Sequence, residues 1–70
     1  MDLRPLGQQL KRLRESKGFT QTQAGALVGL TSVSIARIEA GAQNAPLTTL
    51  ERMFRLYGYS VEVVAQPQGE

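Results

Sequence analysis

The chain has 70 residues, with eight basic and six acidic side chains that leave a formal net charge of +2. It contains no cysteine and no histidine, which excludes disulfides, thiolate metal sites and the side chain that most often serves as general base. A single domain of this length buries only about 60% of its unfolded surface, and it therefore often relies on a partner copy.

The first predicted element is a helix over residues 5–17. Pro5 suits the first turn of a helix. Three leucines follow on one helical face at spacings of four and three: Leu6, Leu10 and Leu13. Gly18 is suited to the position just past the helix end. Five of the eight basic side chains lie within the first seventeen residues, which favours a polyanionic partner, although a solvated helix face explains that feature alone equally well.

Two short helices are predicted next, over residues 21–28 and 32–40. Thr20 and Gln23 have the spacing of a capping box, and Thr31 is the candidate N-cap of the second helix. The first of these helices is expected to pack three side chains inward: Ala24, Leu27 and Val28. Glycines mark the two helix ends: Gly29 and Gly41.

A fourth helix is predicted over residues 48–57, after a loop over residues 42–46. Thr48 and Glu51 have capping-box spacing. Its apolar face is formed by four large side chains: Leu50, Met53, Phe54 and Tyr57. Gly58 is expected to end the helix.

After Gly58 the apolar residues recur at every second position instead of at helical spacing, which predicts a strand over residues 59–65. A lone strand leaves backbone groups unpaired, so we expect it to pair with the same strand of a second copy. Four residues are predicted to hold this dimer: Tyr59, Val61, Val63 and Val64. A disordered segment is the alternative. The predicted organisation is a helical domain over 1–58, the strand over 59–65, and a flexible tail over 66–70.

The helix over residues 32–40 has an unusual outward face. Ile35 and Ile38 define its buried side on a helical wheel, and the opposite side carries short side chains and one arginine: Val33, Ala36, Arg37 and Ala40. Ser32 and Ser34 flank the first turn. Such a face can approach a DNA major groove, with a methyl contact for thymine from Val33 and a long donor from Arg37. Packing of the same face against another protein is the alternative.

Two charged residues are expected to point inward. Glu39 lies beside Ile35 on the wheel, and Arg14 lies at the edge of the leucine face of the first helix. An unpaired carboxylate would be costly there, so we predict an Arg14–Glu39 ion pair that ties the two helices together. A weak surface pair is the alternative.

Three further residues complete the predicted DNA-binding set. Gln21 lies at the start of a helix, where free N–H groups and the positive dipole end favour a phosphate; it can also reach a base edge. A plain helix-start glutamine is the alternative. Arg12 is predicted to contact a phosphate, and Asn44 in the following loop is a further candidate.

These residues carry a family resemblance. The strings Phe19-Thr20-Gln21, Gly29-Leu30-Thr31 and Ile35-Ala36-Arg37-Ile38-Glu39-Ala40-Gly41 resemble the Xre/Cro/cI-type helix-turn-helix family over about residues 6–57. The resemblance implies an all-α, lambda-repressor-like domain of four to five helices, here with a C-terminal strand for dimerisation. It places four residues against DNA: Gln21, Ser32, Val33 and Arg37. It also places Ser34 near the DNA backbone and makes Arg14 and Glu39 an ion pair. Gly25 and Ala36 depart from the family's usual alanine and hydroxyl residue.

The segment LTTLERMFRLYGYSVEVV is similar to the end of HipB-type antitoxins, in which a helix precedes a dimerising strand. This second resemblance implies a protein that represses its own operon and binds a HipA-like kinase toxin.

The sequence therefore predicts a homodimeric repressor that binds a palindromic DNA operator and needs no metal or cofactor. Without histidine or cysteine, and with only six acids, no catalytic constellation can be assembled, so no enzyme activity is expected. No apolar run reaches membrane-spanning length and no signal peptide is apparent, which indicates a cytoplasmic, nucleoid-associated protein. The competing hypothesis is a protein-interaction module that inhibits a partner enzyme without relying on DNA.

Overall fold

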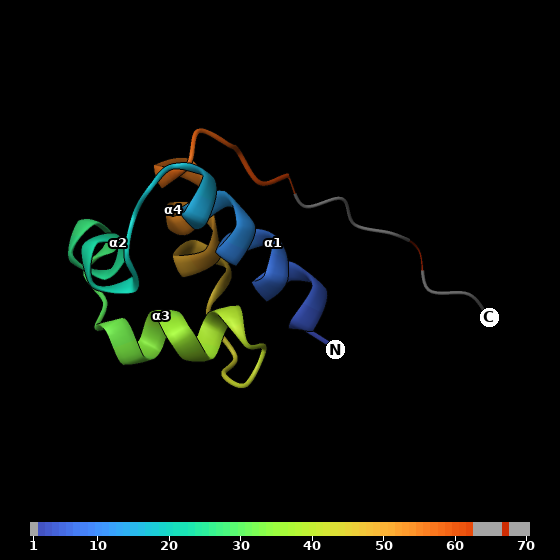
Figure 1. The fold of residues 1–70 in the computed structure, drawn as a ribbon. Coiled ribbons are helices and arrows are strands. Elements are labelled where there is room, and N and C mark those ends of the chain that lie inside the picture. The colour runs from blue at the N-terminus through green and yellow to red at the C-terminus, as the bar shows by residue number, and fades with distance from the viewer. Residues whose placement is uncertain (1, 63–66, 68–70) are drawn as a thin grey trace.

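The computed structural model describes residues 2–62 and residue 67. Four helices follow one another in this part of the chain: α1 (Arg4–Ser16), α2 (Gln21–Val28), α3 (Ser32–Glu39) and α4 (Leu47–Leu56). Figure 1 shows α3 along one side of the molecule, with α2 next to its beginning and α1 and α4 stacked over it. The predicted all-α class is confirmed, and each helix boundary lies within one residue of the prediction.

The core lies where the four helices meet. It is formed by buried side chains from every helix: Leu10, Ala24, Val28, Ile35, Ile38, Leu50, Met53, Phe54 and Tyr57. The rings of Phe19 and Tyr57 lie 6.3 Å apart between centroids and close the core at the end of α1. Leu27 was expected to belong to this core, but 58% of it is exposed. The reason is that α2 has only eight residues, and Ala24 and Val28 already fill its buried face.

The helix ends follow the local sequence signals, with one exception. All four glycines predicted to end helices have positive φ: Gly18, Gly29, Gly41 and Gly58. The predicted capping box of Thr48 and Glu51 is absent, because α4 begins one residue earlier than predicted and Pro46 is its N-cap, with no side-chain cap. The carbonyl of Pro46 accepts the N–H groups of Thr49 and Leu50 at 3.0 and 3.1 Å.

The segment after α4 differs from the prediction. Residues 59–62 form no strand, and Val63 and Val64 lie outside the described residues. The backbone N–H of Tyr59 donates to the carbonyl of Phe54 at 3.0 Å and so belongs to the end of α4, while Val61 packs against the chain's own core. A single copy offers no partner strand, so the alternating residues have no neighbouring strand with which to form backbone hydrogen bonds.

Candidate nucleic-acid interface

Short local contacts fix the start of α2 and the turn between α2 and α3. Thr20 accepts the N–H of Gln23 at 3.0 Å, and the Gln23 side chain accepts the N–H of Thr20 at 2.9 Å, so the capping box is confirmed. Thr31 caps α3 by accepting the N–H of Ser34 at 3.1 Å. The N–H of Leu30 donates to the carbonyl of Gly25 at 2.8 Å. The capping box satisfies backbone groups at the start of α2, and the other two bonds do so at the turn that leads into α3.

Gly25 is required by the same turn. A Cβ atom at this position would lie 2.5 Å from the carbonyl oxygen of Leu30, which is backbone and cannot rotate away. Gly7 plays a similar part in α1, since a Cβ there would lie 2.5 Å from the carbonyl oxygens of Ile38 and Glu39. Glycine in a helix costs about 1 kcal/mol relative to alanine. At these two positions it allows α2 and α1 to approach both ends of α3 closely.

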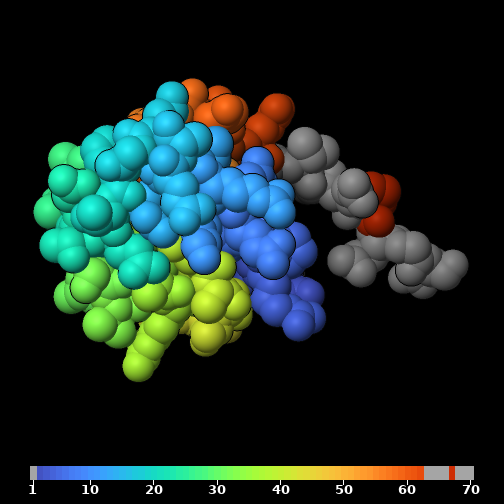
Figure 2. Space-filling view, in the orientation of Figure 1, coloured from blue at the N-terminus to red at the C-terminus, as the bar shows by residue number. Residues whose placement is uncertain are grey.

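The two faces of α3 differ in chemistry. Ile35 and Ile38 are buried, whereas Val33 is 58% exposed, and Arg37 and Ala40 are also exposed. Three smaller side chains are half-buried: Ser32, Ser34 and Ala36. Figure 2 shows α3 forming the lower edge of the molecule next to α2. The outward face is therefore an open ridge of short side chains with one long cation.

The Arg14–Glu39 pair joins α1 to α3 inside the protein. Arg14 Nε donates to Glu39 Oε2 at 2.7 Å and Nη2 donates to Oε1 at 3.1 Å, a bidentate geometry. Arg14 Nη1 also donates to the carbonyl of Phe19 at 2.8 Å. Only 7% of Arg14 and 4% of Glu39 are exposed. The hydrogen bonds to Glu39 raise the pKa of Arg14 above its ordinary value, so the guanidinium stays charged.

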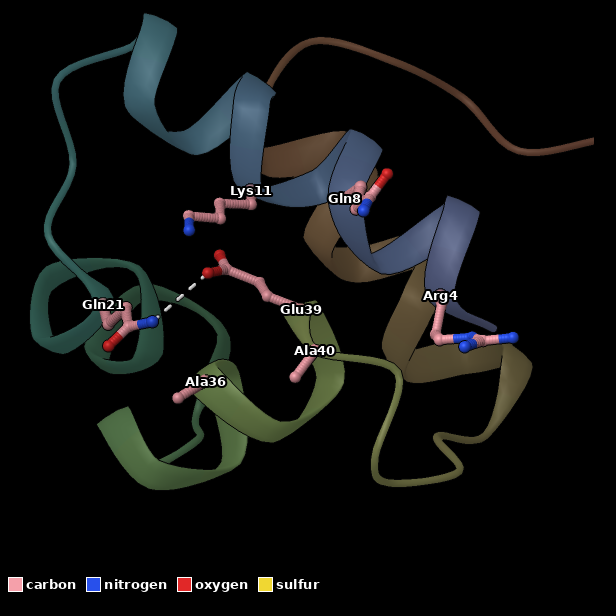
Figure 3. Close-up of a pocket in the computed structure, with 7 residues that line it drawn as sticks. All are labelled: Arg4, Gln8, Lys11, Gln21, Ala36, Glu39 and Ala40. Carbon is pink, nitrogen blue, oxygen red and sulfur yellow. Dashed lines mark hydrogen bonds between the residues drawn. The ribbon is translucent and has the colours of Figure 1, made fainter. Parts of the chain in front are cut away.

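A third residue extends this pair towards the surface. Gln21, the first residue of α2, donates from Nε2 to Glu39 Oε1 at 3.3 Å. Figure 3 shows the amide nitrogen of Gln21 directed at Glu39 and its carbonyl oxygen turned away from it. The Glu39 carboxylate of α3 thus accepts hydrogen bonds from α1 and from α2, and so connects all three helices.

A cavity of about 290 Å³ opens beside this junction. Side chains from three helices line it: Arg4, Gln8, Lys11, Gln21, Ala36, Glu39 and Ala40 (Figure 3). Arg4 is held by Asp2 through a 3.0 Å ion pair. Lys11, by contrast, has no ion pair among the residues that the structure describes, and in Figure 3 it points towards the cavity. Beside the outward face of α3, the cavity therefore combines two cations, of which Arg4 is paired with Asp2, with two amides and the Glu39 carboxylate, which is paired with Arg14. Lys11 is the lining residue suited to a phosphate.

The predicted site residues are only partly brought together. Gln21 and Ala36 line the cavity, whereas Ser32, Val33, Ser34 and Arg37 belong to α3 but do not line it. Arg12 is exposed on α1 but does not line the cavity, and Asn44 is exposed in the loop between α3 and α4. The sequence reasoning missed Gln8 and Lys11. Their spacing from Arg4, four and seven residues along α1, is the signal that places all three on one helical face.

The part of the chain that the structure describes has neither a metal-ligand cluster nor a membrane-spanning helix. There, no three histidine, cysteine or acidic side chains gather closely enough to hold a metal ion. None of the helices in this part is long and apolar enough to cross a membrane.

Comparisons with known proteins agree with this geometry. Residues 5–66 match the model of the helix-turn-helix domain family. The chain is 32% identical over 63 residues to the HTH-type transcriptional regulator PuuR of Escherichia coli strain K12 and to PuuR of Shigella flexneri, covering 89% of this chain but only 34% of either relative. It is also 32% identical over 71 residues to the uncharacterized HTH-type transcriptional regulator y4dJ of Sinorhizobium fredii, covering 100% of this chain and 92% of that protein. The chain belongs to the helix-turn-helix family.

Proposed function

We propose that this helix-turn-helix protein is a sequence-specific DNA-binding regulator of transcription, and that it represses by occupying its operator. The observation that carries the proposal is the outward face of α3, where short side chains and a single arginine stand opposite two buried isoleucines. A solvated helix would ordinarily carry several long charged side chains on that face. The relatives' names as transcriptional regulators support the same function and support the prediction that the chain is not an enzyme.

In this proposal α3 enters the major groove. Arg37 donates to a guanine, and Val33 contacts a thymine methyl group. The other predicted residues lie close enough to the groove to contribute smaller contacts: Gln21, Ser32, Ser34 and Ala36. Phosphate contacts are assigned to Lys11 in the cavity and to the exposed Arg12 and Asn44.

We further propose that two copies bind a palindromic operator. One module of this size rarely gives useful operator affinity alone. A twofold dimer would place two α3 helices about 34 Å apart, one turn of DNA. Residues 59–65 are proposed to pair across the twofold axis, and the 52% exposure of Tyr59 leaves its side chain available to a second copy. Contact through α4 is the other way to hold the dimer.

The biological setting proposed from the C-terminal resemblance is that of a HipB-type antitoxin that binds a HipA-like kinase. The expected observation is a HipA-like reading frame next to this gene, whose product co-purifies with the chain when the two are co-expressed. A gene neighbourhood without such a kinase would contradict this setting and leave the DNA-binding proposal intact.

DNA binding itself is tested with Arg37→Ala. This change should weaken operator binding by about 1–3 kcal/mol, because it removes the long base-reading donor, and should affect a scrambled duplex much less. Arg12→Ala is the matched control, since loss of a phosphate contact should weaken both duplexes similarly and reduce the salt dependence. Gel-shift titrations at several salt concentrations measure both effects. No salt-dependent binding to any duplex would instead favour the protein-interaction module.

The dimer is tested with Val63→Pro. Proline removes a backbone donor and fixes φ, so it should abolish pairing of residues 59–65 and yield a monomer with greatly reduced operator binding. Val63→Thr, which keeps the N–H and the branched side chain, is the control. Sedimentation and footprinting measure the outcome. A Val63→Pro variant that stays dimeric and protects two half-sites would place the dimer contact in α4.

A further inference from the structure

The hydrogen bond between Gln21 and Glu39 determines which end of the Gln21 amide is available to a ligand. A carboxylate only accepts hydrogen bonds, so the amide must turn its nitrogen towards Glu39. Its carbonyl oxygen consequently points away from Glu39, on the side where Ala36 of α3 carries only a methyl group (Figure 3). Two groups of the Gln21 amide are therefore left for a ligand: the carbonyl oxygen, which accepts, and the second amide hydrogen, which donates.

Glu39 is itself held firmly in this orientation. Both of its oxygens accept hydrogen bonds from the Arg14 guanidinium, and its side chain is almost completely buried. Gln21 is thus anchored to a fixed point, not to another mobile surface group. An amide anchored in this way loses less conformational freedom when it binds.

The free acceptor does not suit a phosphate. Phosphate oxygens only accept hydrogen bonds, so a phosphate at Gln21 could use only the second amide hydrogen and would leave the carbonyl oxygen without a donor. In the major groove, the groups that donate are the exocyclic amines of adenine and cytosine. Lys11, in the same cavity, is the residue suited to the phosphate.

We propose that Glu39 is a positioning residue for sequence readout: it holds the Gln21 amide so that its carbonyl oxygen accepts a hydrogen bond from an exocyclic amine of adenine or cytosine. This inference rests on the proposed binding of α3 in the major groove. It narrows the expected role of Gln21 from either a phosphate or a base contact to a base contact, and it gives the buried ion pair a part in recognition.

The test uses the duplex that the wild-type protein selects from a pool of randomised DNA. Each adenine of that duplex is replaced in turn by purine, and each cytosine by 2-pyrimidinone, which remove only the exocyclic amine. At one base pair, removal of the exocyclic amine should weaken the binding of the wild-type protein to the duplex about fivefold or more. Which of the two replacements has this effect identifies the base. At that base pair, removal of the amine should not change the affinity of the Gln21→Ala variant.

Glu39→Gln should reduce the same discrimination, because a neutral amide no longer dictates which way Gln21 faces. The measured quantity is the ratio of the affinities of one protein preparation for two duplexes, so any loss of folded protein cancels. Gln8→Ala, which changes the lining of the same cavity without touching Glu39, should keep the wild-type ratio.

Three outcomes overturn the inference. In the first, no amine removal distinguishes wild type from Gln21→Ala. In the second, the effect of Gln21→Ala disappears when a single phosphate is made neutral as a methylphosphonate. In the third, Glu39→Gln keeps the full wild-type ratio. Failure of the wild-type protein to select any sequence would overturn the proposed function itself, which makes the two failures distinguishable.

Discussion

The α2–α3 pair and the region around α4 are built by different means. Both short helices begin at a threonine cap, and the turn between them is closed by the bond from Leu30 to Gly25. Helix α4 has no side-chain cap and leads into an exposed tyrosine at position 59. Its contribution is mostly apolar, through Leu50, Met53, Phe54 and Tyr57 in the core. The surface proposed to meet DNA is therefore held largely by polar contacts, whereas α4 is held mainly by packing, with one hydrogen bond from Arg52 Nη1 to the Val28 carbonyl at 3.1 Å.

This comparison teaches where directional contacts are needed. A helix that reads DNA must keep its angle and register, and hydrogen bonds define both. A helix that mainly fills the core needs a suitable apolar face, and its first residue matters less.

The largest expected effect tests whether the Arg14–Glu39 ion pair is one of the polar contacts that hold the α2–α3 pair in place. Glu39→Ala should lower the free energy of unfolding by about 3 kcal/mol, because Arg14 is left buried and unpaired. Replacing both residues together by well-packed apolar ones should recover much of the loss. Denaturant unfolding at fixed protein concentration measures both variants. A loss near zero for Glu39→Ala would show that the pair holds nothing together and would remove a main difference between the two regions.

The next effect compares two threonines that the sequence presents alike. Thr31→Ala should cost about 1 kcal/mol of stability, because it removes the cap bond to Ser34. Thr48→Ala should cost less than about 0.5 kcal/mol, because Thr48 lies inside the first turn of α4 and alanine is the better helix former. Thermal and denaturant melts of the matched pair provide the measurement. Equal losses would mean that α4 depends on its first turn as much as α3 does.

The smallest effect concerns the polar atom buried at the end of α4. The Tyr57 hydroxyl has no hydrogen-bond partner in the described part of the chain, and burial raises the pKa of this phenol. Tyr57→Phe should therefore raise the free energy of unfolding by about 1 kcal/mol or less. Tyr59→Phe, at an exposed neighbour, is the control and should change little. A clear loss for Tyr57→Phe would reveal a polar contact in a region described as apolar.

The success of prediction from sequence follows the same division. The caps at Thr20 and Thr31 and the end of α2 at Gly29 depend on residues close in sequence, and all were predictable. The Arg14–Glu39 pair was also predictable, since two inward charges on two helices have few ways to be satisfied.

The errors and omissions arose from contacts between distant segments. The exposure of Leu27 and the actual start of α4 depend on how the helices pack. The cavity shared by Gln8, Lys11 and Gln21 exists only because α1 crosses the start of α2 and the end of α3. The predicted strand depends on a second copy, which one chain cannot supply.

The absent side chain at Gly25 has a consequence for how this protein could diverge. The Leu30 carbonyl occupies the space that a Cβ would need, so the angle between α2 and α3 is encoded at a residue that contacts no ligand. The outward side chains of α3 take no part in that turn. Descendant sequences could therefore acquire a new operator by exchanging residues such as Val33 and Arg37 while the docking angle stays inherited. A substitution at position 25 would instead require the Leu30 carbonyl to shift, and with it the turn that leads into α3.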